Sequence, residues 1–170
     1  MNTKQPLSMQ VRPIGVIHSA FKEPKGAPIQ PVFGKRGEGK VEVFKQYVEA
    51  LADLEGFERI WLLYWFDRAS DFKTIVKPFM DDKPHGLFAT RAPSRPNPIG
   101  FSSVKLLSID GNTLHVGEID ILDNTPLLDI KPYARKFDCY DVKRNGWLDT
   151  TNKKTAESDT RFYTDQEEGI

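Results

Sequence analysis

The chain has 170 residues, 24 basic and 24 acidic side chains, and a single cysteine, Cys139. A chain of this length fits one domain that buries roughly 70% of its unfolded surface, so it needs no disulfide or metal ion to fold. The zero net charge argues against a protein whose whole surface attracts nucleic acid. Residues 1–9 are polar, one thiol forms no internal disulfide, and no apolar run reaches the ~20 residues that span a bilayer. These features predict a soluble cytoplasmic protein with no membrane segment.

Strands and turns dominate the first half of the chain. Residues 11–18 mix β-branched and polar side chains, which favours a strand. They lead into a loop at 23–39 that is rich in proline and glycine, and a loop of this length in a small domain is uncommon unless it has a function. Residues 40–44 alternate as a strand does. The apolar positions of residues 44–54 recur with the spacing of an amphipathic helix.

The second half continues with strands. Residues 60–66 form a continuous apolar run rich in aromatic side chains, which favours a strand buried on both faces. Residues 86–90 have the pattern of another short strand. Residues 101–109 and 113–121 flank an Asp-Gly-Asn turn, and this arrangement is typical of a hairpin.

The sequence therefore predicts a mainly β fold: a single closed or nearly closed β-barrel with one short amphipathic helix. Many strands without βαβ alternation argue against a doubly wound sheet. We expect the barrel domain to span residues 10–138 and a C-terminal extension to span 139–170. The extension is polar, and from about residue 152 it has the composition of a weakly ordered tail.

A stiff loop is the most unusual local feature. Residues 89–100 contain three prolines, each of which fixes its own φ and restricts the residue before it. The loop therefore holds Arg91, Arg95 and Asn97 in set directions. Such a loop meets a ligand without ordering side chains, each of which costs roughly 0.5–1.5 kcal/mol. The alternative is a stiff connection between strands with its arginines in water.

A second unusual stretch, residues 120–133, places Asp120, Asp123 and Asp129 in an apolar setting. A carboxylate in such a setting either caps a turn or faces a cation or a donor-rich ligand. Metal binding is open in principle, but no histidine stands nearby in the sequence, and we expect no metal. Signatures of a phosphate loop, a dinucleotide fold or a Ser-His-Asp triad are also missing from the sequence.

Three segments closely resemble signature segments of the TsaA-like (TrmO) family. They are Phe-Ala-Thr-Arg at 88–91, Arg-Pro-Asn-Pro-Ile-Gly at 95–100, and Asp-Asn-Thr-Pro-Leu-Leu-Asp-Ile-Lys-Pro-Tyr at 123–133. Ile-Gly-Val-Ile-His-Ser at 14–19 is also similar to that family. The resemblance runs from about residue 12 to residue 137 in the family's order, and motifs of this length are specific.

The resemblance implies a homodimeric β-barrel that binds S-adenosylmethionine near the subunit interface. It also implies methylation of N6 of threonylcarbamoyl-adenosine, the nucleoside beside the anticodon in certain tRNAs. By similarity, the cofactor contacts are Pro31, Val32, Phe33, Asp67, Arg68, Arg91, Phe101, Asp120, Ile121, Leu122 and Asp123. Among these, Arg91 is suited to bind the cofactor's carboxylate with two parallel hydrogen bonds.

The chain is also expected to bind the methyl acceptor, a nucleoside in tRNA. Asn97 or Asp129 is expected to accept the N–H of the reacting amine, and the two are not ranked. Basic segments at 22–40 and 131–144 are expected to contact tRNA phosphates. The expected substrate-binding residues are Arg95 of the stiff loop and Lys131, Arg135 and Lys136 of the second basic segment.

Two other functions stay open at this point, because a fold does not determine a substrate. The first is a small-molecule methyltransferase or a non-enzymatic cofactor-binding module on the same barrel. The second is a structural or interaction barrel without a cofactor.

Overall fold

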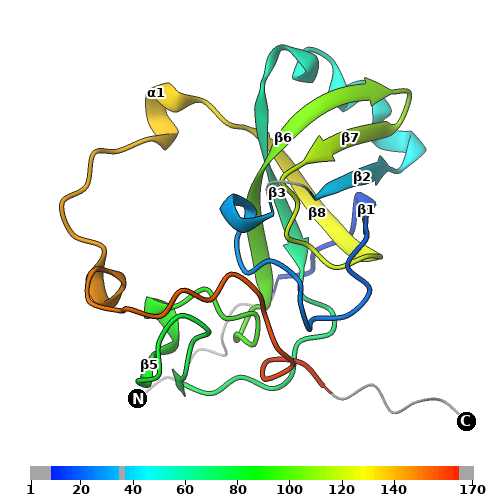
Figure 1. Ribbon diagram of the computed structural model, residues 1–170. Helices are drawn as coiled ribbons and strands as arrows, with labels where there is room; N and C mark the ends of the chain where they lie inside the picture. Colours follow the sequence, from blue (N-terminus) through cyan, green and yellow to red (C-terminus); the bar gives the residue numbers. More distant parts are fainter. Residues whose placement is uncertain (1–8, 35–36, 165–170) are drawn as a thin grey trace, which may run out of the picture.

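The computed structural model describes residues 9–34 and 37–164. Within this part of the chain, six antiparallel strands close into a barrel in the order β1-β2-β7-β6-β3-β8 (Figure 1). The strands are β1 (Gly15–Ser19), β2 (Glu38–Val43), β3 (Arg59–Trp65), β6 (Ile99–Asp110), β7 (Thr113–Gly117) and β8 (Thr125–Pro132). A separate small sheet pairs β4 (Ile75–Val76) with β5 (His85–Gly86). The predicted closed, mainly β barrel is confirmed.

Some sequence expectations fall outside the described residues. These are the polar N-terminus up to residue 8, Lys35 and Arg36 of the first basic segment, and the last part of the tail, residues 165–170.

The barrel core follows from the alternation of side chains along each strand. In β3, Ile60, Leu62 and Tyr64 point inward and are at most 4% exposed, whereas the residues between them are partly exposed. The expectation that this run is buried on both faces was therefore wrong: its outer face is only partly covered, and Trp65 is 45% exposed. The interior is filled by Ile17, Val41, Val43, Ile60, Leu62, Tyr64, Val104, Leu114, Val116, Ile119, Ile121 and Leu127.

The helices are short. The amphipathic helix predicted at 44–54 is instead a pair of 3₁₀ helices, η2 (Lys45–Leu51) and η3 (Leu54–Gly56). The apolar spacing still describes the packing, since Leu51 and Leu54 join the barrel core. Asp53 separates the two with a left-handed backbone (φ 65°), which no continuous helix accommodates. The other short helices are η1 (Pro31–Phe33), η4 (Leu87–Ala89), α1 (Arg135–Asp138) and η5 (Gly146–Asp149).

Three segments differ from the strand expectations. The strand predicted at 86–90 is β5 followed by η4, because the Thr90 hydroxyl donates to the Leu87 carbonyl and closes a helical turn. The hairpin strand predicted at 113–121 ends at Gly117, where Glu118 takes a left-handed backbone (φ 59°). Residues 125–132, whose strand the sequence reading did not identify, form β8, which pairs with both β1 and β3 and closes the barrel.

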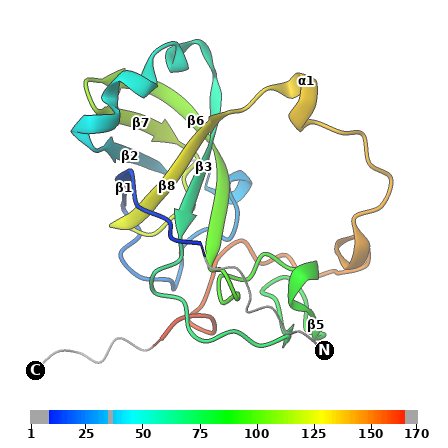
Figure 2. The ribbon, with the colours of Figure 1, turned by 180° about the vertical axis from the view of Figure 1, so that it is seen from behind.

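The chain after residue 152 differs from the weakly ordered tail expected for it. The chain leaves the barrel after α1 and, in the segment that contains these residues, returns beside η4 and β5, as both views show (Figures 1 and 2). The Ser158 amide donates to the Ala27 carbonyl over 2.8 Å, and the Ile29 amide donates to the Ala156 carbonyl over 3.0 Å. Phe162 is only 6% exposed, in a second apolar cluster outside the barrel.

Candidate cofactor site

A cavity of about 680 Å³ lies where the barrel meets its loops. This volume is within the range of roughly 300–1,000 Å³ that is usual for small-molecule sites. Its walls come from segments far apart in the sequence: the long loop at 27–30, the end of β3, the proline loop at 88–95, the turn at 120–122 and C-terminal residues within 147–163. The fold therefore brings together the two unusual stretches that the sequence singled out.

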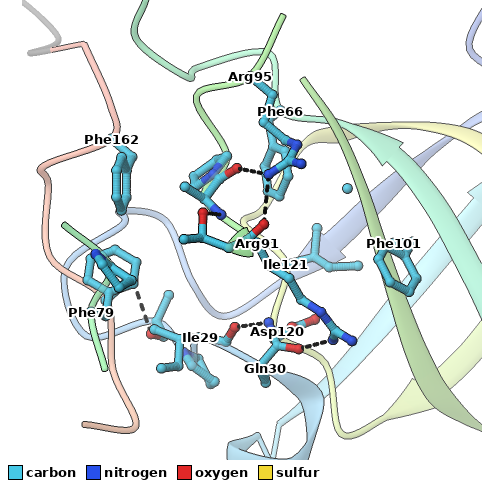
Figure 3. A pocket seen from close by; sticks show the side chains of 18 of the residues that line it. Ile29, Gln30, Phe66, Phe79, Arg91, Arg95, Phe101, Asp120, Ile121 and Phe162 are labelled. Carbon is cyan, nitrogen blue, oxygen red and sulfur yellow. Dashed lines mark hydrogen bonds between the residues drawn. The ribbon is translucent and has the colours of Figure 1, made fainter. Parts of the chain in front are cut away.

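Arg91 forms the cationic side of this cavity. Its guanidinium donates through Nη1 to the Gln30 side-chain oxygen and lies 5.0 Å from the centroid of the Phe101 ring. The pairing holds the guanidinium in place while it stays exposed to the cavity. Figure 3 shows Arg91, Gln30 and Asp120 close together, with Phe101 beside them.

Asp120 carries the unusual electrostatics of the site. Its Oδ1 atom is buried and has no hydrogen-bond partner among the described residues. Burial raises the pKa of Asp120 to about 7, against the opposing effects of the Ser102 hydroxyl and the Arg91 guanidinium. A buried carboxylate without a partner costs free energy, and a ligand that brings a cation or a donor relieves that cost. Asp120 is thus a candidate contact for a cationic ligand.

Two tyrosines border Asp120. The Tyr64 hydroxyl lies 3.1 Å from the Ser102 hydroxyl, and burial raises the pKa of Tyr64 well above its usual value. Burial likewise raises the pKa of Tyr163 to about 12, although Arg68 acts in the opposite direction. Both phenols therefore keep their protons at neutral pH, and both line the cavity as possible donors.

Arg68 lines the cavity but is mainly engaged with the protein. Its Nη2 atom donates to the Asp123 carbonyl and to the Thr125 hydroxyl, each over 2.9 Å. Its Nε atom lies 3.5 Å from Asp67 Oδ1. Arg68 therefore fixes the turn that follows Asp120 and keeps Asp67 at the cavity wall.

The proline loop is held by its own side chains. Arg95 Nη1 donates to the carbonyls of Thr90 and Ala92, over 2.9 and 3.3 Å. Its guanidinium lies 5.7 Å from the centroid of the exposed Phe88 ring. Because Arg95 also lines the cavity, these contacts stiffen the loop on the side that faces a ligand.

Most of the predicted cofactor contacts come together in this cavity. Its walls include Asp67, Arg68, Arg91, Phe101, Asp120, Ile121 and Leu122. The structure places four others elsewhere. Pro31, Val32 and Phe33 form η1 directly after the lining residue Gln30, with Val32 and Phe33 exposed.

Asp123 points to the opposite side of its turn. It accepts hydrogen bonds from the Ser19 amide and from the Lys22 ammonium, and it lies 3.6 Å from His18. Burial acts to raise its pKa, but Lys22, the Ser19 amide and His18 together hold the pKa of Asp123 below its usual value. The carboxylate therefore ties its turn to residues 18–22 and faces the Lys22 ammonium, and facing a cation is one of the two roles that the sequence left open.

The predicted acceptor residues do not line the cavity. Asn97 is exposed, and Asp129 on β8 pairs with Lys131 over 2.7 Å. Arg135 and Lys136 lie in α1, also outside the cavity walls. The roles expected for these residues stay predictions.

Several cavity residues were missed by sequence reasoning. Gln30 stands in the proline- and glycine-rich loop at 23–39, from which only the neighbouring residues 31–33 were named as cofactor contacts, and Tyr64 was counted only as part of a buried strand. Trp147, Phe162 and Tyr163 lie in a polar extension that gave no periodic signal. Their aromatic character, unusual in that composition, was the one available hint.

In the part of the chain that the structure describes, no group of three or more His, Cys, Asp or Glu side chains is placed to hold a metal ion. Among the helices of residues 9–34 and 37–164, none has the length and apolar character that crossing a bilayer requires.

Residues 16–139 match the tRNA-methyltransferase O N-terminal domain family. The chain belongs to this family. It is 51% identical to a Pyrococcus abyssi protein named "Probable S-adenosyl-L-methionine-binding protein", over 93% of this chain and 87% of that one. It is 37% identical to the tRNA (adenine(37)-N6)-methyltransferase of Escherichia coli, over 74% of this chain and 58% of that protein.

The fold agrees with a solved member of the family. A crystal structure of TrmO from Pseudomonas aeruginosa superposes with a TM-score of 0.70 at 39% identity, over 82% of this chain. The matched part is 62% of that structure, so this chain spans less than two thirds of it. The names of these relatives agree with the family and the cofactor that the signature segments predict.

Proposed function

We propose that the chain binds S-adenosylmethionine in this cavity and transfers its methyl group to N6 of threonylcarbamoyl-adenosine in tRNA. The observation that carries the proposal is the presence, in one cavity, of the exposed Arg91 guanidinium and of a buried Asp120 oxygen, Oδ1, that has no hydrogen-bond partner among the described residues. Its support from relatives is the cofactor in the name of the Pyrococcus protein and the reaction in the name of the Escherichia coli enzyme.

The charges of the site fit the cofactor. S-adenosylmethionine has a carboxylate, an ammonium and a sulfonium, and when bound it supplies a methyl group activated by the positive sulfur. Arg91 is placed to bind the carboxylate, and Asp120 to face one of the two cations. A cation beside Asp120 favours its ionised form, so cofactor binding lowers the pKa of this carboxyl from about 7.

The chain's part in the transfer is alignment. The N6 amine is a weak nucleophile because its lone pair is delocalised into the ring. The rigid loop that carries Arg91 and the buried donors around Asp120 fix one reactant and exclude water. Holding amine, methyl group and sulfur in line can supply ~7–11 kcal/mol of the barrier. Asn97 and Asp129 are the sequence-based candidates for accepting a hydrogen bond from the N–H of the amine. The proton that the methylated amine releases passes to a carboxylate or to water, because an amide oxygen such as that of Asn97 is too weak a base to take it.

The tRNA would be held mainly through its phosphates. Lys131, Arg135 and Lys136 lie together at the end of β8 and in α1. We propose that these residues contact the anticodon stem and that two copies of the chain form a dimer. Light scattering that returns the 19.4 kDa of a single chain at micromolar concentration would exclude the dimer.

The deciding assay uses tRNA from a host strain that lacks this protein. The tRNA is incubated with the protein and S-adenosylmethionine labelled in the methyl group, then digested to nucleosides. The expected result is label in N6-methylated threonylcarbamoyl-adenosine. Calorimetry with the cofactor alone is the parallel measurement. If the cofactor binds and no tRNA nucleoside acquires label, the small-molecule reaction or the non-enzymatic module replaces the tRNA reaction.

A further inference from the structure

Residues 140–164, here called the C-terminal strap, contact the loops around the cavity. The strap begins directly after the matched family domain, which ends at residue 139. It leaves α1, passes through η5 and returns beside η4 and β5, as Figures 1 and 2 show. The strap supplies five lining residues: Trp147, Leu148, Ser158, Phe162 and Tyr163.

Backbone hydrogen bonds fix the strap to the long loop. The amides of Gly26 and Ile29 donate to the carbonyls of Ser158 and Ala156, and the Ser158 amide donates to the Ala27 carbonyl, all over 2.8–3.0 Å. This pairing joins the strap to the loop segment that itself lines the cavity.

The Phe162 carbonyl ties two further loops to the strap. It accepts from the Ser70 amide over 3.0 Å and from the Ser94 hydroxyl over 2.8 Å. The Phe162 ring is buried against Val76, Leu87 and Ala92. The strap is therefore a built part of the cavity wall.

The strap forms an aromatic end of the cavity. Phe162 meets Phe79 edge to face, with ring centroids 5.2 Å apart. The Trp147 ring stacks on His85 at 4.7 Å, and its Nε1 atom donates to the Ala89 carbonyl over 2.8 Å. Figure 3 shows Phe79 and Phe162 on the side of the pocket opposite Phe101. The cavity thus has a charged end and an aromatic end.

Stacking on a planar ring of the ligand is a role that the two phenylalanines predicted as cofactor contacts, Phe33 and Phe101, leave unfilled. The Phe101 ring already faces the Arg91 guanidinium, and Phe33 does not line the cavity. A planar ring that enters the site finds Trp147 partly exposed and held in orientation by His85 and Ala89. Trp147 has two constraints on its position and an accessible indole, as a stacking residue requires.

We propose that the C-terminal strap builds a subsite for an adenine ring and that Trp147 is its principal contact. The proposal rests on the function proposed above, in which both the cofactor and the acceptor nucleoside carry adenine. Base–aromatic stacking has a free energy of ~1–3 kcal/mol per base, so loss of the ring corresponds to roughly 5- to 150-fold in affinity.

The test compares three variants. Trp147→Ala removes the ring, Trp147→Phe keeps a ring and loses the hydrogen bond to Ala89, and Tyr140→Ala removes a strap aromatic that is 76% exposed and does not line the cavity. Calorimetry with S-adenosylmethionine and with adenosine measures ring binding. The KM for tRNA measures the acceptor. Thermal melting verifies that each variant is folded.

We expect Trp147→Ala to weaken the binding of S-adenosylmethionine or of the tRNA acceptor by about tenfold. Trp147→Phe and Tyr140→Ala should stay close to wild type in both. Weaker binding of S-adenosylmethionine assigns the subsite to the cofactor, and a raised KM for tRNA with unchanged cofactor affinity assigns it to the acceptor. A folded Trp147→Ala variant that matches wild type in all three measurements, or an equal loss in Tyr140→Ala, overturns the subsite. A wild-type protein that binds neither S-adenosylmethionine nor adenosine overturns the proposed function as well, so the two failures differ.

Discussion

The barrel and the cavity-bearing loops are stabilised in different ways. The barrel interior consists mainly of aliphatic residues such as Leu62 and Leu127, both fully buried, inside a continuous hydrogen-bonded cylinder. The loops and the strap have little regular structure. They are joined by single hydrogen bonds such as that from Ser94 to the Phe162 carbonyl, and by a small apolar cluster. The barrel is thus a scaffold of high local stability, and the site lies on the segments that open at lower free energy.

This difference separates changes that unfold the protein from changes that empty its site. A residue inside the barrel acts on the free energy of global unfolding. A residue on the loops acts on ligand affinity, and on the exposure of backbone amides near the cavity. Substitutions in the barrel and in the loops therefore differ in which of these two quantities they change.

The largest effect is expected inside the barrel. Leu62 is fully buried in β3, and Leu62→Ala should lower the free energy of unfolding by about 2–5 kcal/mol, because it removes packed methyl groups and leaves a cavity. The matched control, Leu148→Ala, changes a strap leucine that is 46% exposed and should stay within ~0.5 kcal/mol. Denaturant unfolding measures both. Equal losses would show that strap and barrel unfold as one cooperative unit.

Asp120 should make the stability of the ligand-free protein depend on pH. Its pKa of about 7 exceeds the ordinary value of 3.8, so the folded state holds a proton that the unfolded state has lost between those values. Stability therefore falls as pH rises from about 4 to about 7 and stays reduced above that, by on the order of 4 kcal/mol. Asp120→Asn should remove this fall when unfolding is measured across the pH range.

Asp123, in the same turn, should make stability depend on pH in the opposite direction. Its lowered pKa means that its contribution to stability is present above the ordinary carboxyl pKa and is lost as pH falls. Asp123→Asn should therefore be most destabilising near neutral pH and approach wild type in acid. Parallel curves for the two variants would contradict the assignment of a cavity role to Asp120 and of pairing with Lys22 and the Ser19 amide to Asp123.

The sequence predicts the barrel better than the loops and the strap, because the barrel strands follow from local patterns and the strap depends on contacts between residues far apart in the sequence. The continuous apolar run of residues 60–66 and the hairpin around the Asp-Gly-Asn turn identify barrel strands because those patterns are local. Arg91 and Asp120 were found because they stand in or beside distinctive segments. The strap was not found, because its placement depends on contacts such as Ser158 to Ala27, which are 131 residues apart and leave no periodic pattern.

Arg91 should affect binding and leave the fold intact. It is exposed, and its polar contact is with Gln30, so Arg91→Ala removes a charged partner of the cofactor without disturbing the barrel. A hydrogen bond to a charged group has a free energy of ~1.5–3 kcal/mol, which is roughly 10- to 150-fold in the dissociation constant. Calorimetry with S-adenosylmethionine measures it. Unchanged affinity in a variant with normal melting would place Arg91 outside the binding contacts.

The smallest expected effect on the cofactor comes from the basic residues beyond the cavity. Lys131, Arg135 and Lys136 do not line it, so changing all three to alanine should leave the affinity for S-adenosylmethionine unchanged. The same variant should bind tRNA more weakly, because it makes fewer phosphate contacts. Its binding then releases fewer counterions, so the affinity for tRNA depends less steeply on salt concentration. Titrations at several salt concentrations give the slope for wild type and variant. A variant with the wild-type slope would remove these residues from the tRNA interface. Weaker cofactor binding would instead show that β8 and α1 support the cavity, and the separation between barrel surface and site would fail at this point.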